Sequence, residues 1–193
     1  DRLYTCKSDS VARRSCQTSL DYLLNILVRL IAPILSYTAE EIWQSSERLN
    51  NQEESIFLSN YDLSEINEES IITKSDWNRI FEIKNDVNQS IEEMRNENQL
   101  KGSLDANVYI EANKNDIKIL EKLGAELHFL FICSETNIIE NNNFKITVKS
   151  SDNQKCTRCW HRHESVGTSK KHPDLCNRCI ENVDGEGEKR SFV

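Results

Sequence analysis

The stretch Cys156-Thr-Arg-Cys159, answered by Cys176-Asn-Arg-Cys179, decides how the C-terminal part of this chain folds. Two C-x-x-C pairs at this separation have the spacing of a four-thiolate zinc site. Each pair forms a tight knuckle that brings two sulfurs to one ion, and the loop between the pairs completes a tetrahedron of protein ligands. Because no position stays open for water or substrate, the spacing predicts one structural Zn²⁺ and no catalytic metal.

The other interpretation of the two pairs is a set of disulfides or redox-active thiols. A redox C-x-x-C pair usually opens a helix inside a βαβ unit, whereas Lys155, Trp160 and His161 place the first pair in a polar, turn-rich segment. The remaining cysteines stand singly in apolar or helical surroundings and are predicted to be reduced thiols, namely Cys6, Cys16 and Cys133. This usage favours zinc and a cytoplasmic location.

Charge is distributed unevenly along the 193 residues, whose net charge is −8. Residues 31–154 carry eleven basic against twenty-three acidic side chains, while residues 1–30 and 155–193 each have a small basic excess. Local patches steer binding, so the acidic total does not exclude a nucleic acid. The absence of an initiator Met leads us to expect a longer protein, and no apolar run predicts a membrane span.

Apolar residues at three- and four-residue spacing predict three helices. The first begins after Asp9 or Ser10 and ends near Pro33, with Leu27 on its buried face. The second covers about 39–49, with Thr38 and Glu41 as a capping box. The third runs from a cap at Ser75 or Asp76 to about Gln99, and its inner stripe is Trp77, Ile80, Phe81, Lys84, Val87, Ile91 and Met94.

The hydrophobic period changes after residues 101–103. Apolar residues that alternate with polar ones predict strands at 104–110 and 144–148. A short helix is expected from Asn115 or Asp116 to about Glu126. Residues 129–133 are a third strand candidate, with His128 as a core or edge residue rather than a base. The predicted fold is therefore mainly α: a helical-bundle fragment at 1–100, a small β-α-β-β linking unit at 101–152, and a four-cysteine zinc-ribbon or knuckle module at 153–193.

Several basic and aromatic side chains are candidates for RNA contact. Unpaired bases stack on aromatic rings or guanidinium planes, and basic side chains bind phosphates. Trp160 could instead pack against its knuckle, and the charged groups could be solvated or paired within the protein. The candidates are Arg13, Arg14, Arg158, Trp160, His161, Lys170, Lys171, Arg178, Lys189 and Arg190. We expect Arg158, Trp160 and Arg178 to form one RNA-facing surface.

Motifs at both ends resemble class I aminoacyl-tRNA synthetases. Asp1-Arg-Leu-Tyr-Thr5, Ala12-Arg-Arg14, Leu30-Ile-Ala-Pro-Ile-Leu35 and Thr38-Ala-Glu-Glu-Ile-Trp43 are similar to the helical anticodon-binding domain of the isoleucine, valine and leucine enzymes. The C-terminal motifs look like the zinc module of the bacterial-type isoleucine enzymes; they are Lys155-Cys-Thr-Arg-Cys-Trp-His161, His172-Pro173, Cys176-Asn-Arg-Cys179 and Gly187-Glu-Lys-Arg190. The segment Gly102-Ser-Leu-Asp-Ala106 also resembles the linking segment of those enzymes.

The resemblance implies the C-terminal part of a cytoplasmic ligase that uses ATP to attach isoleucine to tRNA(Ile) and edits valine. The family's two ATP-handling signatures and any editing site are missing from these residues, so the chain is expected to bind tRNA and the remainder of a synthetase, to hold no catalytic residue, and to bind neither DNA nor membrane. Two alternatives remain: the zinc-finger end of a DNA-repair glycosylase, and a zinc-ribbon protein-interaction module.

Overall fold

A computed structural model describes residues 1–46, 53–60 and 70–192. The chain divides into two compact units. One contains Asp1, Leu3–Ala12 and Glu69–Val193, and the other contains Arg2 and Arg13–Glu68. Among the described residues, no helix combines the length and apolar character that a membrane crossing requires.

The smaller unit is built on helices α2 (Val11–Ile31) and α3 (Ser36–Ser45), with the 3₁₀ turn η1 (Ile56–Leu58) against them. Helix α2 follows Ser10 and ends two residues before Pro33, as the sequence predicts. The core is small because α2 contributes only its last turns, and it consists of Val28, Ala32, Ala39, Trp43 and Ile56. Trp43 is fully buried, and its Nε1 donates to the carbonyl of Glu53 at 2.9 Å.

Two expectations about these helices are wrong. Leu27 is 54% exposed, because the buried residue of that turn is its neighbour Val28. Thr38 does not cap α3, since the amide of Ala39 already donates to the carbonyl of Leu35 at 2.8 Å and the helix has therefore begun before Thr38. The last residues of the helix predicted at 39–49 lie outside the described residues.

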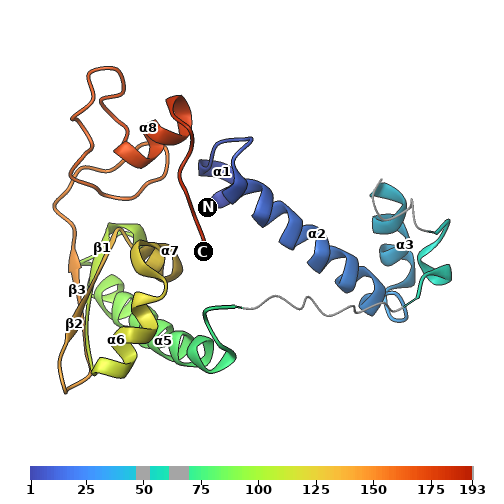
Figure 1. Cartoon of the computed structure of the whole chain (residues 1–193), viewed down its shortest axis with the longest axis horizontal. Coiled ribbons are helices and arrows are strands. Elements are labelled where there is room, and N and C mark those ends of the chain that lie inside the picture. The colour runs from blue at the N-terminus through green and yellow to red at the C-terminus, as the bar shows by residue number, and fades with distance from the viewer. Residues whose placement is uncertain (47–52, 61–69, 193) are drawn as a thin grey trace. The chain divides into compact units, whose positions relative to one another are not determined.

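The larger unit places helix α5 (Lys74–Asn96) against a small sheet (Figure 1). The cap of α5 is Thr73 rather than Ser75 or Asp76. The Thr73 side chain accepts from the amide of Asp76, and the Asp76 carboxylate accepts from the amide of Thr73, which forms a capping box. An ion pair with Lys122 and these bonds hold the pKa of Asp76 at about 2.

The sheet has the strand order β2-β1-β3. Strand β1 (Ala106–Ala112) lies in the centre, after the 3₁₀ turn η2 (Ser103–Asp105). It pairs in parallel with β2 (Glu135–Glu140) and antiparallel with β3 (Lys145–Ser150). The crossover from β1 to β2 contains α6 (Lys114–Glu121), the 3₁₀ turn η3 (Gly124–Glu126) and α7 (Leu127–Phe131). A parallel pair requires such a crossover connection.

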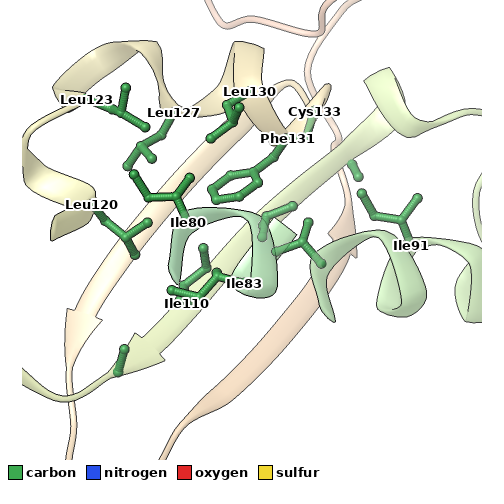
Figure 2. Packing of buried hydrophobic residues seen from close by; sticks show 14 of the residues in the cluster. Ile80, Ile83, Ile91, Ile110, Leu120, Leu123, Leu127, Leu130, Phe131 and Cys133 are labelled. Carbon is green, nitrogen blue, oxygen red and sulfur yellow. The ribbon is translucent and has the colours of Figure 1, made fainter. Parts of the chain in front are cut away.

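One hydrophobic core joins α5, the sheet and the crossover helices (Figure 2). Residues Ile80, Ile83, Val87 and Ile91 of α5 are buried at helical spacing, and β1 buries alternate residues. Phe131 is fully buried and lies among them. This core extends across residue 100, where the sequence analysis places a domain boundary; the three-part division itself stays a prediction.

The strand predicted at residues 129–133 is wrong, and strand β2 was not predicted. Leu127, Leu130 and Phe131 are buried at helical spacing, and the segment is helix α7, which ends at left-handed Ile132 (φ 54°). In a short apolar run, periodicity alone does not distinguish a buried strand from a buried helix. Phe81 was predicted to lie on the inner stripe of helix α5, but it is 48% exposed and Ile83 takes the inner position. The mainly helical class with a small α/β unit and a C-terminal four-cysteine module is confirmed.

Candidate metal centre

Four cysteines converge in the segment after β3. The Sγ atoms of Cys156, Cys159, Cys176 and Cys179 all lie within 4.8 Å of one another, and all four residues are buried. The Cys159 and Cys176 sulfurs are 3.7 Å apart. A tetrahedron with Zn–S bonds of about 2.3 Å has edges of about 3.8 Å, so this separation suits a shared zinc ion without an S–S bond.

Local backbone bonds build each knuckle. In the first, the amide of Trp160 donates to the carbonyl of Cys156 at 3.0 Å, and the amide of Cys156 donates to the carbonyl of His161 at 2.9 Å. The second knuckle opens helix α8 (Asn177–Asp184), for which Cys176 is the N-cap residue. The amide of Cys176 also donates to the sulfur of Cys156 at 3.4 Å, which links the two knuckles.

The chemistry of the sulfurs fits a dication. The hydrogen bond between the Cys159 and Cys176 sulfurs lowers the pKa of Cys176 and raises the pKa of Cys159. The guanidinium of Arg158 adds positive charge, with its Nη1 3.8 Å from the Cys179 sulfur. A zinc ion would displace the shared protons and be held by four thiolates, with the backbone and Arg158 as outer hydrogen-bond donors.

The N-terminal part of the chain, which includes the helical region, matches a known family. Residues 1–118, more than half of the chain, match the anticodon-binding domain of tRNA ligases. The chain belongs to this family. Residues 153–182 match a zinc finger found in FPG and IleRS, and with the four-sulfur cluster this shows that the family member carries a structural zinc module.

Curated relatives of this anticodon-binding family member match it over its full length. Isoleucine–tRNA ligase of Histophilus somni (strain 2336) is 40% identical over 205 residues, and that of Hahella chejuensis (strain KCTC 2396) is 42% identical over 208 residues. The isoleucine–tRNA ligase of Shewanella halifaxensis (strain HAW-EB4) is 40% identical over 207 residues. Each alignment covers all of this chain, which spans 22% of the length of these relatives.

The two arginines inside the knuckles extend toward the N-terminal segment. Nη1 of Arg158 donates to the carbonyl of Thr5 at 2.6 Å. Nη2 of Arg178 donates to the Asp1 carboxylate at 2.7 Å and to the Thr5 hydroxyl at 2.6 Å. Nε of Arg178 donates to Glu188 at 2.7 Å. Intramolecular partners therefore occupy both side chains, which the sequence analysis assigned to RNA.

Arg190 is also held within the protein. Its side chain is 2% exposed, and Nη1 lies 3.2 Å from the Asp1 carboxylate. The guanidinium carbons of Arg190 and Arg178 lie 3.3 Å and 4.6 Å from the centre of the Phe129 ring. Amides of Ser191 and Phe192 donate to the Glu126 carboxylate. The C-terminal tail is thus attached beside α7, and the Arg190 guanidinium presents almost no surface to a phosphate.

The two aromatic candidates next to the first knuckle have opposite surroundings. Trp160 is 61% exposed, so it is not a core residue, and its indole lies 5.7 Å from Nζ of Lys155. His161 is buried, with its ring edge-on to His128 and Phe129. Burial lowers the pKa of His161 to about 4, and the charge of Arg178 acts in the same direction. A neutral, buried imidazole is a packing group here.

The remaining candidates are spread over the surface. Lys170 and Lys189 are exposed, and Lys171 pairs with Asp184 at 2.6 Å. Arg14 is exposed and Arg13 half-buried at the start of α2. None of the residues that hold the arginines was predicted to contact them; these residues are Asp1, Thr5, Glu126, Phe129 and Glu188. Their pairing spans up to 189 positions, so no local signal could have shown it.

Proposed function

We propose that this chain binds tRNA(Ile) as part of an isoleucine–tRNA ligase, with one structural Zn²⁺ bound by Cys156, Cys159, Cys176 and Cys179. The proposal extends to the whole enzyme: it attaches isoleucine to tRNA using ATP, edits valine and acts in the cytoplasm, with the chemistry carried by parts of the protein outside these residues. Membership of the anticodon-binding family and the full-length similarity to isoleucine–tRNA ligases support it.

The observation that carries the RNA contact is the conformation of Trp160. Its φ is +68°, a left-handed value that is unfavourable for any residue with a Cβ and that glycine adopts freely. The same residue exposes 61% of its surface, so burial does not compensate for the strain. The knuckle fixes this backbone, since the amide of Trp160 donates to the carbonyl of Cys156 at 3.0 Å. An exposed ring held on a rigid zinc knuckle suits stacking on an unpaired base.

We propose that lysine rather than arginine makes the phosphate contacts. Arg158, Arg178 and Arg190 are engaged within the protein, whereas Lys155 lies against the Trp160 ring. A lysine beside a stacking ring can neutralise the phosphate of the stacked nucleotide. We therefore assign the RNA surface to Trp160 and Lys155. Further candidates are Lys170, Lys171, Lys189 and Arg14, which are exposed, and Arg13, which is half-buried. DNA is not an expected partner.

Trp160→Gly should separate RNA binding from stability. It removes the ring and the strain together, so the thermal midpoint and zinc content should equal or exceed those of the wild type. Affinity for tRNA(Ile) should fall about tenfold, because stacking contributes about 1–3 kcal/mol per base. Trp160→Phe keeps a ring and should recover most of the affinity. Equilibrium binding, thermal melting and zinc analysis on the same samples measure all three quantities.

Ile132→Gly provides the matched control. Ile132 is also left-handed, at φ +54°, and 52% exposed, so glycine relieves the same kind of strain there. Its tRNA affinity should equal that of the wild type. Wild-type affinity in Trp160→Gly would contradict base stacking. Tighter binding of lesion-containing DNA than of tRNA would favour the glycosylase alternative, and binding of neither would favour a protein-interaction module.

A further inference from the structure

The zinc module holds the segment that precedes α2. Residues 1–7 contain the four-residue helix α1 (Arg2–Thr5), which is too short to be stable alone. Thr5 and Cys6 are the buried residues of this segment. Both have partners in the zinc module and its tail: Thr5 contacts Arg158 and Arg178, and the Cys6 sulfur donates to the Glu188 carboxylate at 3.1 Å.

Arg158 and Arg178 make the direct link to the metal ligands. Each lies between the two cysteines of its knuckle, so metal binding fixes the backbone from which its side chain extends. Arg158 reaches the carbonyl of Thr5 at 2.6 Å, and Arg178 reaches the Thr5 hydroxyl and the Asp1 carboxylate at 2.6 Å and 2.7 Å. The ligand loops and α1 are thereby joined across more than 150 residues of sequence.

Helix α8 and the chain after it form the second half of the contact. The amide of Lys7 donates to Oδ1 of buried Asn182 at 3.1 Å, and Nζ of Lys7 donates to the carbonyl of Gly185 at 3.0 Å. Gly187 has a φ of +92°, and a Cβ built there would lie 3.2 Å from the Cβ of Lys7. The left-handed backbone favours glycine at this position, and a Cβ there would press on Lys7.

We propose that Arg158 and Arg178 are positioning residues that make the order of residues 1–7 depend on zinc. The ion orders the knuckles, the knuckles aim the two guanidiniums, and these hold the segment that precedes α2 in the chain. This role goes beyond tRNA binding and does not require RNA. It also explains why the knuckle arginines face the protein: their partners are a carbonyl, a hydroxyl and carboxylates of the same chain.

Hydrogen exchange at the Lys7 amide tests the proposal on the whole chain without RNA. This amide reports the contact because its acceptor is Asn182 in α8. In the zinc-loaded Arg158→Ala/Arg178→Ala double variant, exchange at Lys7 should rise at least about tenfold while amides of α5 and β1 stay unchanged. Chelation of zinc from the wild type should raise it further. Arg178→Lys should be intermediate, because an ammonium cannot reproduce the planar fork of donors.

Two further variants keep the test decisive. Arg14→Ala changes an exposed arginine of α2 and should leave Lys7 exchange at the wild-type rate. If the double variant loses zinc, the zinc-loaded Arg178→Lys variant takes its place. Gly187→Ala, whose new Cβ opposes Lys7 and not a cysteine, should also speed exchange at Lys7 and shows how the amide responds when the contact itself is loosened. Wild-type exchange in the zinc-loaded variants would overturn the proposal. So would protection of Lys7 that persists after chelation has unfolded residues 153–184.

Discussion

Cys159→Ser is expected to abolish stoichiometric zinc binding and to unfold residues 153–184, while α5 and the three-stranded sheet remain folded. The module has little else to stabilise it: its buried cluster is the four cysteines and Val166, with Leu175 partly buried beside them. Metal-binding free energy is folding free energy in such modules, with apparent values of about 10–16 kcal/mol in zinc-finger peptides. Elemental analysis and residue-resolved hydrogen exchange measure the two effects.

Cys16→Ser is the matched control for this prediction. Cys16 is half-buried on α2 and lies outside the four-sulfur cluster, so its replacement should leave zinc content unchanged. Retention of a full equivalent of zinc by Cys159→Ser would contradict the four-thiolate site. Loss of the α5 and sheet protection together with the module would show that the module and the larger core unfold as one cooperative unit.

Phe131→Ala should produce the largest loss of stability in the α/β core. Its ring is fully buried among Ile80, Ile83 and Leu130 in the cluster of Figure 2. Removing a buried phenyl ring typically costs about 3–5 kcal/mol, because a cavity remains where the ring was. Denaturant unfolding followed by circular dichroism should show the transition of this unit shifted to much lower denaturant concentration.

Phe81→Ala offers the same chemical change on an exposed surface. Phe81 is 48% exposed and stacks on Trp77 at 5.7 Å, so its removal should cost about 1 kcal/mol, mainly the ring contact. Equal losses for Phe81→Ala and Phe131→Ala would mean that the core is not where the structure places it.

The fold could be predicted where periodicity and spacing specify it locally. The helix at Val11–Ile31, the helix at Lys74–Asn96 and the strand at Ala106–Ala112 all follow from apolar spacing, and two cysteine pairs specify the metal site. The prediction failed at residues 129–133 because a short apolar run fits either a strand or a buried helix. The predicted burial of Leu27 was wrong, because a broad apolar stripe does not show which of its residues a short neighbouring helix will cover.

The environment of the candidate RNA residues could not be predicted, since it depends on contacts remote in sequence. An arginine next to a zinc ligand has the same local sequence whether it meets a phosphate or Asp1, and only the fold brings Asp1 to Arg178. Trp160 differs from the arginines in that its backbone conformation is fixed locally, because it directly follows the second cysteine of the knuckle. Its exposure, however, follows from the absence of a covering element among the described residues.

The most direct test of a tRNA(Ile)-binding chain is its affinity for tRNA(Ile) compared with the same tRNA carrying a substituted anticodon. The zinc-loaded chain is predicted to bind the native anticodon at least about tenfold more tightly, because loss of one stacked or recognised base costs about 1–3 kcal/mol. Equal affinity for the two tRNAs would contradict binding of tRNA(Ile) through its anticodon, which membership of the anticodon-binding family leads us to propose.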